Sequence, residues 1–205
     1  MRLRASQIAI ERGGRRLCSN LSFELGKGEA LIVVGPNGAG KTSLLRAIVG
    51  LLPLAEGSIS AEGGDDEASV GEQAHYLGHA DALKGALTAR ENLEFWAALL
   101  AQGGSAKTPL EALKRLGLAH VLDLPVRALS AGQKRRVALA RLLAASRPLW
   151  LLDEPLTALD EAAQRLCLDV LREHLAGGGL VIAATHAPIG LAGASELRLG
   201  GAEAL

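Results

Sequence analysis

The sequence predicts an α/β fold with a mostly parallel central sheet, interrupted by a stretch of helices. Three runs of apolar residues, at 30–34, 149–152 and 180–184, are short and continuous, as strands buried on both faces of a parallel sheet are. Helical patterns of apolar residues alternate with these strands, which is typical of α/β sheets. Residues 80–129 have almost entirely helical patterns, so we expect a helical insertion there.

Shorter patterns complete the predicted sheet and its connections. Residues 3–10 and 21–25 alternate between polar and apolar side chains, as half-buried strands do. The sequence Gly-Lys-Gly-Glu at 26–29 predicts a turn before the strand at 30–34. The polar stretch at 61–73 is expected to be a solvated surface connection.

Helices are predicted where apolar residues recur at helical spacing, over residues 43–49, 88–101, 109–118, 130–145 and 161–175. The helix at 88–101 has a clear start, because Thr88 is a predicted N-cap and Glu91, three residues later, completes a capping box. The sequence Gly-Gly-Ser at 103–105 is expected to end that helix.

Composition predicts a single-domain protein of the reducing cytoplasm. The 205 residues fit one domain, and 49% of them are apolar, which is enough for a core. Lys and Arg together number 22, as do Asp and Glu, so no net charge points to nucleic acid as a partner. Cys18 and Cys167 stand outside any C-x-x-C motif, so buried reduced thiols are expected. Neither a signal peptide nor a run of about 18 apolar residues is evident, so no membrane span is predicted.

A phosphate-binding loop is the strongest motif. Residues 35–42 are Gly-Pro-Asn-Gly-Ala-Gly-Lys-Thr, a complete G-x-x-x-x-G-K-[ST] between a strand and a helix. Its glycines let backbone N–H groups approach phosphate oxygens, and the following helix directs its positive end at the same anion. Lys41 is expected to reach the β- and γ-phosphates, and Thr42 to hold Mg²⁺ through its hydroxyl. The predicted nucleotide-binding residues are Gly35, Pro36, Asn37, Gly38, Ala39, Gly40, Lys41, Thr42 and Ser43.

Two carboxylates form a second part of the predicted site. Asp153 and Glu154 follow the apolar strand at 149–152, at the carboxyl end where open α/β sheets place ligands. Asp153 is expected to bind Mg²⁺ through water, and Glu154 to act as the base that polarises the attacking water. The chain is therefore predicted to bind and hydrolyse a nucleoside triphosphate.

A third motif, Leu-Ser-Ala-Gly-Gln at 129–133, resembles the signature sequence of ATP-binding-cassette (ABC) ATPases, L-S-x-G-Q. Its residues Ser130, Ala131, Gly132 and Gln133 combine a hydroxyl, a glycine and a helix N-terminus, which suit a phosphate. They also fit an ordinary helix N-cap. Their position between the phosphate loop and Asp153 favours the ABC family.

The resemblance covers almost the whole chain and implies its fold, ligands and assembly. It implies a single domain, a P-loop NTPase core of ABC type over about 1–79 and 147–205, with an inserted α-helical subdomain over about 80–146. ATP and Mg²⁺ are the implied ligands. Two copies would bind head to tail around two ATP molecules, with the signature residues of one copy against the ATP of the other.

Two further segments resemble family motifs. Thr-Ala-Leu-Asp at 157–160 resembles the D-loop, which implies that Asp160 lies at the dimer seam. Ala-Thr-His at 184–186 resembles the H-loop, which implies that His186 contacts the γ-phosphate and acts in catalysis. A lone histidine after a buried strand would otherwise be a neutral packing residue.

The chain departs from the family pattern at two positions. Arg12 stands where the family usually has an aromatic residue stacked on adenine; a guanidinium can stack on a planar ring, but adenine selectivity is less assured. His79 takes the position of the glutamine that contacts Mg²⁺ and the membrane partner. Gln73 is a weaker candidate for that glutamine because it precedes the strand, and an exposed loop histidine is the alternative for His79.

One segment narrows the resemblance. Tyr-Leu-Gly-His at 76–79, Leu-Lys at 83–84 and the stretch at 87–96 resemble the ATPase subunit of the bacterial cytochrome c maturation haem exporter. This implies integral-membrane partner subunits, a peripheral location on the cytoplasmic face of the inner membrane, and a role in haem export or in release of a haem-loaded chaperone. Cys18 and Cys167 form no Cys-Pro haem motif.

Three alternative functions are compatible with a nucleotide-binding chain of this kind. An exporter subunit for a lipid or drug would keep every nucleotide residue, and the Gly78-His79 segment argues against it. A soluble ABC protein acting on DNA or ribosomes would carry a coiled-coil insertion or two tandem cassettes. A nucleotide-binding regulator without hydrolysis is disfavoured by Glu154 and His186.

Overall fold

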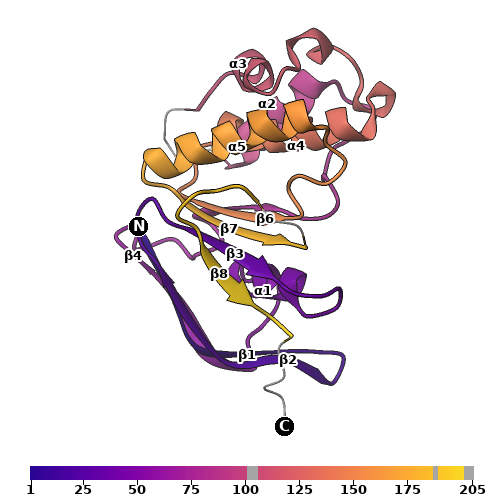
Figure 1. Ribbon diagram of the computed structural model, residues 1–205. Coiled ribbons are helices and arrows are strands. Elements are labelled where there is room, and N and C mark those ends of the chain that lie inside the picture. Colours follow the sequence, from indigo (N-terminus) through magenta and orange to yellow (C-terminus); the bar gives the residue numbers. More distant parts are fainter. Residues whose placement is uncertain (101–105, 187–188, 201–205) are drawn as a thin grey trace. The chain divides into compact units, whose positions relative to one another are not determined.

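The computed structural model describes residues 1–100, 106–186 and 189–200, and the predicted helix end at 101–105 lies outside these residues. The described chain forms two compact units (Figure 1). The sheet unit comprises residues 1–76, 148–154 and 173–200, and the helical unit comprises residues 77–147 and 155–172. Residues 155–172, expected in the core, therefore cluster with the helices instead.

The sheet unit contains a five-stranded sheet in the order β5-β6-β7-β3-β8. Its strands are β3 (Ala30–Val34), β5 (Ala74–Leu77), β6 (Leu149–Asp153), β7 (Leu180–Thr185) and β8 (Ser195–Arg198). The pairs β3–β7, β6–β7 and β3–β8 are parallel. Every residue of β6 and β7 is buried, which explains their unbroken apolar sequences. The predicted α/β fold with a parallel sheet is confirmed.

A second, antiparallel sheet has the order β2-β1-β4. Its strands are β1 (Arg2–Arg12), β2 (Arg15–Leu25) and β4 (Glu56–Glu62), and a two-residue turn joins β1 to β2. The sequence patterns covered only parts of β1 and β2 and missed β4 and β8. These strands are short or exposed on one side, so their pairing with β1 and β3 rather than their own composition makes them strands.

Helix α1 (Lys41–Ile48) packs against β6 and β7. Its buried Leu44, Leu45 and Ile48 join β3, β6 and β7 residues in one apolar cluster of the sheet unit. Because the start of α1 is fixed by this buried face, the loop before it is held at the carboxyl end of β3.

The helical unit is built from α2 (Ala89–Leu100), α3 (Pro109–Arg115) and α4 (Ala131–Ala144), with two short 3₁₀ turns, Ala119–Val121 and Val126–Ala128. Helices α2 and α3 both pack on α4. Helix α5 (Glu161–Ala176) begins in this unit and ends in the other. The predicted capping box of α2 is confirmed: the Glu91 N–H donates to the Thr88 hydroxyl over 3.1 Å, and the Thr88 N–H donates to the Glu91 carboxylate over 2.7 Å.

Candidate functional site

Residues 35–40 connect β3 to α1 and present a helix N-terminus to solvent. The N-cap residue Gly40 offers no side chain to the first N–H groups of α1, so these donors remain available to an anion. Gly35 has φ +152°, and a Cβ there would lie 2.4 Å from the Leu199 carbonyl oxygen. Only glycine therefore fits at the start of the loop, where β8 ends against it.

Lys41 and Thr42 open α1 with their side chains on the site. Lys41 is buried, and its Nζ donates to the carbonyl oxygens of Gly35 over 2.6 Å and Pro36 over 3.2 Å. The ammonium group is thus held over the loop, where a phosphate would lie. The Thr42 hydroxyl donates to the Asp153 carboxylate over 2.8 Å.

The Thr42–Asp153 contact brings together residues 111 positions apart in sequence. One hydroxyl and one carboxylate are the kind of sparse oxygen set with which proteins hold Mg²⁺, the remaining ligands being phosphates and water. Among the described residues no cluster of three or more His, Cys, Asp or Glu side chains forms a metal site. The residues present therefore fit a magnesium ion shared with a nucleotide, rather than a metal caged by protein.

Glu154 follows Asp153 in a strained conformation. Its φ is +50°, in the left-handed region that non-glycine residues seldom adopt, and its N–H donates to the Ala184 carbonyl oxygen over 2.8 Å. Its carboxylate lies 2.8 Å from His186 Nδ1 and 3.4 Å from the Thr185 hydroxyl. The ends of β6 and β7 therefore join the two predicted catalytic side chains.

Exposure differs between the two partners of this pair. The Glu154 side chain is 18% exposed, whereas the His186 side chain is 63% exposed. A carboxylate that is partly shielded from water and held by an imidazole is suited to accept a proton from one positioned water molecule. The exposed imidazole remains free to contact a further group.

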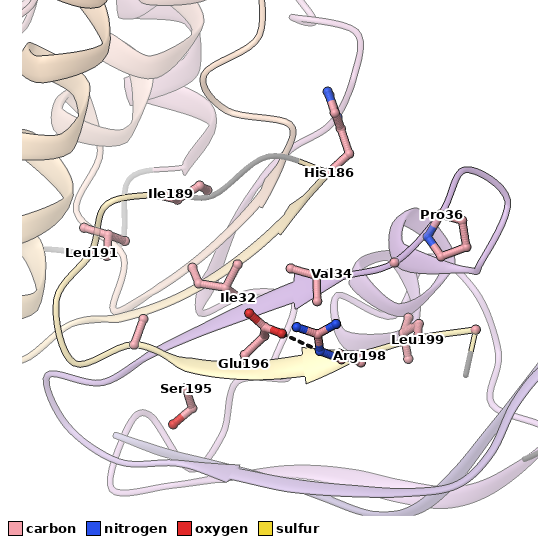
Figure 2. Close-up of a pocket in the computed structure, with 13 residues that line it drawn as sticks. Ile32, Val34, Pro36, His186, Ile189, Leu191, Ser195, Glu196, Arg198 and Leu199 are labelled. Atoms are coloured by element: carbon pink, nitrogen blue, oxygen red, sulfur yellow. Dashed lines mark ion pairs between the residues drawn. The ribbon is translucent and has the colours of Figure 1, made fainter. Parts of the chain in front are cut away.

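An open hollow of about 760 Å³ adjoins the phosphate loop on the His186 side (Figure 2). Gly35, Pro36 and His186 line it at one end, and β8 lines it with Glu196 and Arg198, whose side chains form an ion pair of 2.7 Å. Of the residues expected at the phosphates, Gly35, Pro36 and His186 line this hollow, whereas Lys41, Thr42, Asp153 and Glu154 do not.

The signature residues lie in the helical unit at the start of α4. The Gln133 N–H donates to the Ser130 hydroxyl over 3.2 Å, and the Ser130 N–H donates to Gln133 Oε1 over 2.9 Å. This is a capping box, so the ordinary N-cap role is present. Ser130 and Ala131 are nevertheless exposed, with Gly132 and Gln133 partly so. The helix N-terminus can therefore meet a group from outside this chain.

Asp160 and His79 also belong to the helical unit. The Asp160 carboxylate accepts the N–H of Ala163 over 2.8 Å and so caps the start of α5, a local role that the sequence analysis did not foresee. His79 is exposed, which agrees with the alternative interpretation that it is an ordinary loop histidine. Its exposure is equally compatible with contact to a partner.

Gln73, the weaker candidate for the family glutamine, is engaged in its own loop. It is 4% exposed, its amide nitrogen donates to the carbonyl oxygens of Asp65 and Ala68, and its amide oxygen accepts the Asp65 N–H. All these bonds lie within the surface connection at 65–73. The side chain therefore orders that loop and is not presented to a ligand.

Two residues near the site had no assigned role in the sequence analysis. Thr185 places its hydroxyl beside the Glu154 carboxylate, and Leu17 of β2 packs against Gly40, with its Cβ 3.1 Å from where a Cβ on Gly40 would lie. The β1–β2 hairpin that carries the exposed Arg12 thus lies beside the end of the phosphate loop. The position of Thr185 next to His186 is the signal that was available in the sequence.

Comparison with known proteins adds to this geometry. Residues 18–157 match the family model described as ABC transporter. Proteins of Nitrobacter winogradskyi and Bradyrhizobium diazoefficiens, both named cytochrome c biogenesis ATP-binding export protein CcmA, are 55% and 54% identical to this chain. These similarities span 98% of this chain and 100% and 99% of the two relatives.

Solved structures show the same fold. A putative ABC transporter ATP-binding protein from Pyrococcus furiosus superposes with a TM-score of 0.83 at 23% identity, covering 97% of this chain and 98% of its own. An ATP-binding cassette in a dimeric post-hydrolysis state, bound to ADP and Pi, has a TM-score of 0.77 at 26% identity, covering 90% of this chain and 88% of its own.

Proposed function

The chain belongs to the ABC transporter family as an ATP-hydrolysing cassette, and from this premise we propose that it drives a membrane complex of c-type cytochrome maturation. The names of its relatives, together with identities above half over nearly the whole chain, support that process. The work done by ATP is haem export or release of a haem-loaded chaperone.

One contact carries the proposed chemistry: the 2.8 Å approach of Glu154 to His186 beside the phosphate loop. Glu154 accepts a proton from a water molecule, whose oxygen attacks the γ-phosphorus while the bond to the β–γ bridging oxygen breaks and ADP leaves. His186 orients the base and donates to the γ-phosphate. The shielding of Glu154 keeps other water away from the carboxylate.

The remaining residues of the sheet unit bind and orient the nucleotide. The loop N–H groups and the start of α1 hold the β- and γ-phosphates, and Lys41 moves its donors from the loop carbonyls to the phosphates. Thr42 and Asp153 hold Mg²⁺, which when bound neutralises phosphate charge. The Arg12 side chain, which belongs to the β1–β2 hairpin, stacks on the adenine ring of the nucleotide.

The second half of each site comes from a second copy of the chain. Ser130 and Gly132 present a hydroxyl and a helix N-terminus to the γ-phosphate held by the partner, and Asp160 lies at the seam. The exposure of Ser130 and Ala131 supports this role, because a helix N-terminus open to solvent can meet a phosphate held by a second copy.

A membrane partner docks on the helical unit near His79. Leu83 and Leu87 are partly buried, Phe95 is 38% exposed and Leu99 is 61% exposed. Trp96 is held by its own unit, since its Nε1 donates to the Ala82 carbonyl oxygen over 3.2 Å and the Arg141 guanidinium stacks on its ring. Among the described residues no helix is long and apolar enough to cross a bilayer. In the proposed complex the integral-membrane subunits are separate chains, and this chain lies peripherally on the cytoplasmic face of the inner membrane.

The process is tested in the source bacterium. Deleting the gene should abolish covalent haem staining of c-type cytochromes, and a plasmid copy should restore it only if Glu154 is intact. Affinity capture of the tagged chain from membranes should recover the integral-membrane partners. Normal c-type cytochromes in the deletion strain would contradict a role in c-type cytochrome maturation. They would favour an exporter of another substrate.

The docking surface is tested by charge. Leu83→Glu and Leu87→Glu should each reduce recovery of the membrane subunits about tenfold, because a charge desolvated at an interface is costly. Leu110→Glu, at a leucine that is 46% exposed on α3, is the matched control. Unchanged recovery of the membrane subunits with both test variants would move the docking surface elsewhere.

A further inference from the structure

Arg135 is a buried charge in the second turn of α4, just after the signature residues. It is 5% exposed, although the sequence Lys-Arg-Arg at 134–136 has the composition of a solvated basic run. A buried guanidinium is stable only where its donors are satisfied, so its partners show what the side chain holds.

The partners of Arg135 lie on two loops far apart in sequence. Its Nη1 donates to the Gly78 carbonyl oxygen over 3.0 Å and to the Asp81 carboxylate over 2.9 Å. Its Nε donates to the Pro155 carbonyl oxygen over 3.4 Å. A single guanidinium group therefore connects Gly78 and Asp81, which lie on either side of His79, to Pro155, which follows Glu154.

The loop after Glu154 touches α4 at a second point. A Cβ on Gly132 would lie 2.9 Å from the Ala158 carbonyl oxygen, and Ala158 has φ +64°. The first two turns of α4 thus hold residues 155–158 at both ends. A shift of α4 would move Pro155, and through the peptide bond Glu154, together with the signature residues.

The segment around His79 is fixed by other side chains of the helical unit. Asn92, fully buried, donates to the Lys84 carbonyl oxygen over 3.0 Å and accepts the Lys84 N–H over 2.8 Å. Ala82 has φ +53°, and Trp96 holds its carbonyl oxygen. The segment is therefore held within its own unit by Asn92 and Trp96 as well as by Arg135.

We propose that Arg135 is a positioning residue that links the His79 segment to the catalytic carboxylate of Glu154, with Asp81 as its charged partner. A partner pressing on the His79 segment moves the guanidinium, and the guanidinium moves the Pro155 carbonyl. ATP turnover is thereby set by the state of the His79 segment. This link rests on the proposed role of Glu154 as the base.

A purely structural ion pair would have a different signature. It would stabilise the helical unit, and a lysine at 135 would retain most of its effect by keeping the charge next to Asp81. The proposed link needs two donor directions at once, toward Asp81 and toward Pro155, which a single ammonium does not supply in the same geometry. Arg135→Lys therefore separates the two roles.

The experiment measures steady-state MgATP hydrolysis, affinity for a fluorescent ATP analogue and melting temperature in the full-length chain. Arg135→Lys should keep the melting temperature and the nucleotide affinity, yet lower kcat about tenfold, since a misplaced catalytic group costs rate rather than binding. Asp81→Asn should lower kcat in the same direction by about threefold, because the amide oxygen still accepts one hydrogen bond.

Arg90→Gln is the matched control, because it breaks an exposed 2.8 Å ion pair of the same unit with Asp123 and should leave kcat unchanged. Glu154→Gln is measured in parallel. Wild-type kcat in Arg135→Lys beside an inactive Glu154→Gln would overturn the link alone. Hydrolysis by Glu154→Gln would overturn the base assignment and the link together. Loss of kcat in Arg135→Lys with none in Asp81→Asn would overturn the connection to the His79 segment.

Discussion

The phosphate loop in the sheet unit and the signature segment in the helical unit are built from similar parts but are completed differently. Each offers glycine, a hydroxyl and the N-terminus of a helix. Around the phosphate loop, Lys41, Thr42, Asp153, Glu154 and His186 contact one another or the loop within one chain. Around the signature segment, the side chains of Ser130 and Gln133 each bond to the other residue's backbone N–H, and the segment is exposed or partly exposed. In the proposed function the first holds the nucleotide within one chain, and the second completes the site of another copy.

The largest effect is expected at the phosphate loop. Lys41→Ala should reduce ATP turnover at least about 100-fold without unfolding the chain, because no neighbouring side chain can supply its charge to the phosphates. An ATP hydrolysis assay measures turnover, and circular dichroism measures whether the variant is folded. Lys114→Ala, at an exposed position of α3, is the control. Normal turnover in a folded Lys41→Ala protein would end the assignment of this loop.

Glu154→Gln separates binding from chemistry within the same unit. The amide keeps the shape and loses the base, so hydrolysis should fall about 100-fold while ATP binding persists. An ATP-bound dimer should then accumulate in size-exclusion chromatography. The exposed Glu62→Gln on β4 is the control, and if Glu154→Gln hydrolyses ATP at the normal rate another group is the base.

Ser130→Arg tests the other side of the comparison. The new side chain would fill the space of the partner's γ-phosphate, so dimer formation and turnover should fall about tenfold or more while each monomer still binds labelled ATP. Ser146→Arg, exposed beyond the opposite end of α4, should change neither. Weakened ATP binding by the monomer would show instead that Ser130 acts in the site of its own chain.

The smallest effect concerns acid stability and depends on His174 of the sheet unit. This residue stacks on Trp150 at 3.7 Å between ring centroids, and burial lowers its pKa from 6.5 to about 4. The unfolded chain therefore binds the proton more readily, and the free energy of unfolding should fall as pH drops from about 6.5 toward 4, by about 1–2 kcal/mol.

Urea unfolding at a series of pH values measures this dependence. His174→Gln should flatten it between pH 6.5 and 4, whereas His120→Gln at an exposed position should not. An unchanged pH profile in His174→Gln would assign the acid sensitivity to other groups.

Much of the fold and part of the site followed from local sequence. The strand at 30–34 has its predicted bounds, and the buried strands and helices lie where continuous apolar runs and 3.6-residue periods predict them. The capping boxes at Thr88 and Ser130 formed because their hydrogen bonds span only three residues. The phosphate loop is equally local, since its motif, strand and helix are adjacent in the chain.

Tertiary structure alone decided which polar residues meet. Residues 42 and 153 are brought together by the pairing of β3, β7 and β6, which no local pattern encodes. Packing turned Arg135 of a basic run inward onto Gly78, Asp81 and Pro155, and turned Gln73 into its own loop. The exposed strands β4 and β8 likewise exist because partners accept their hydrogen bonds. The physical reason is common to these cases: periodicity and caps act over a few residues, whereas hydrogen bonds and ion pairs between distant segments depend on where the whole chain places them.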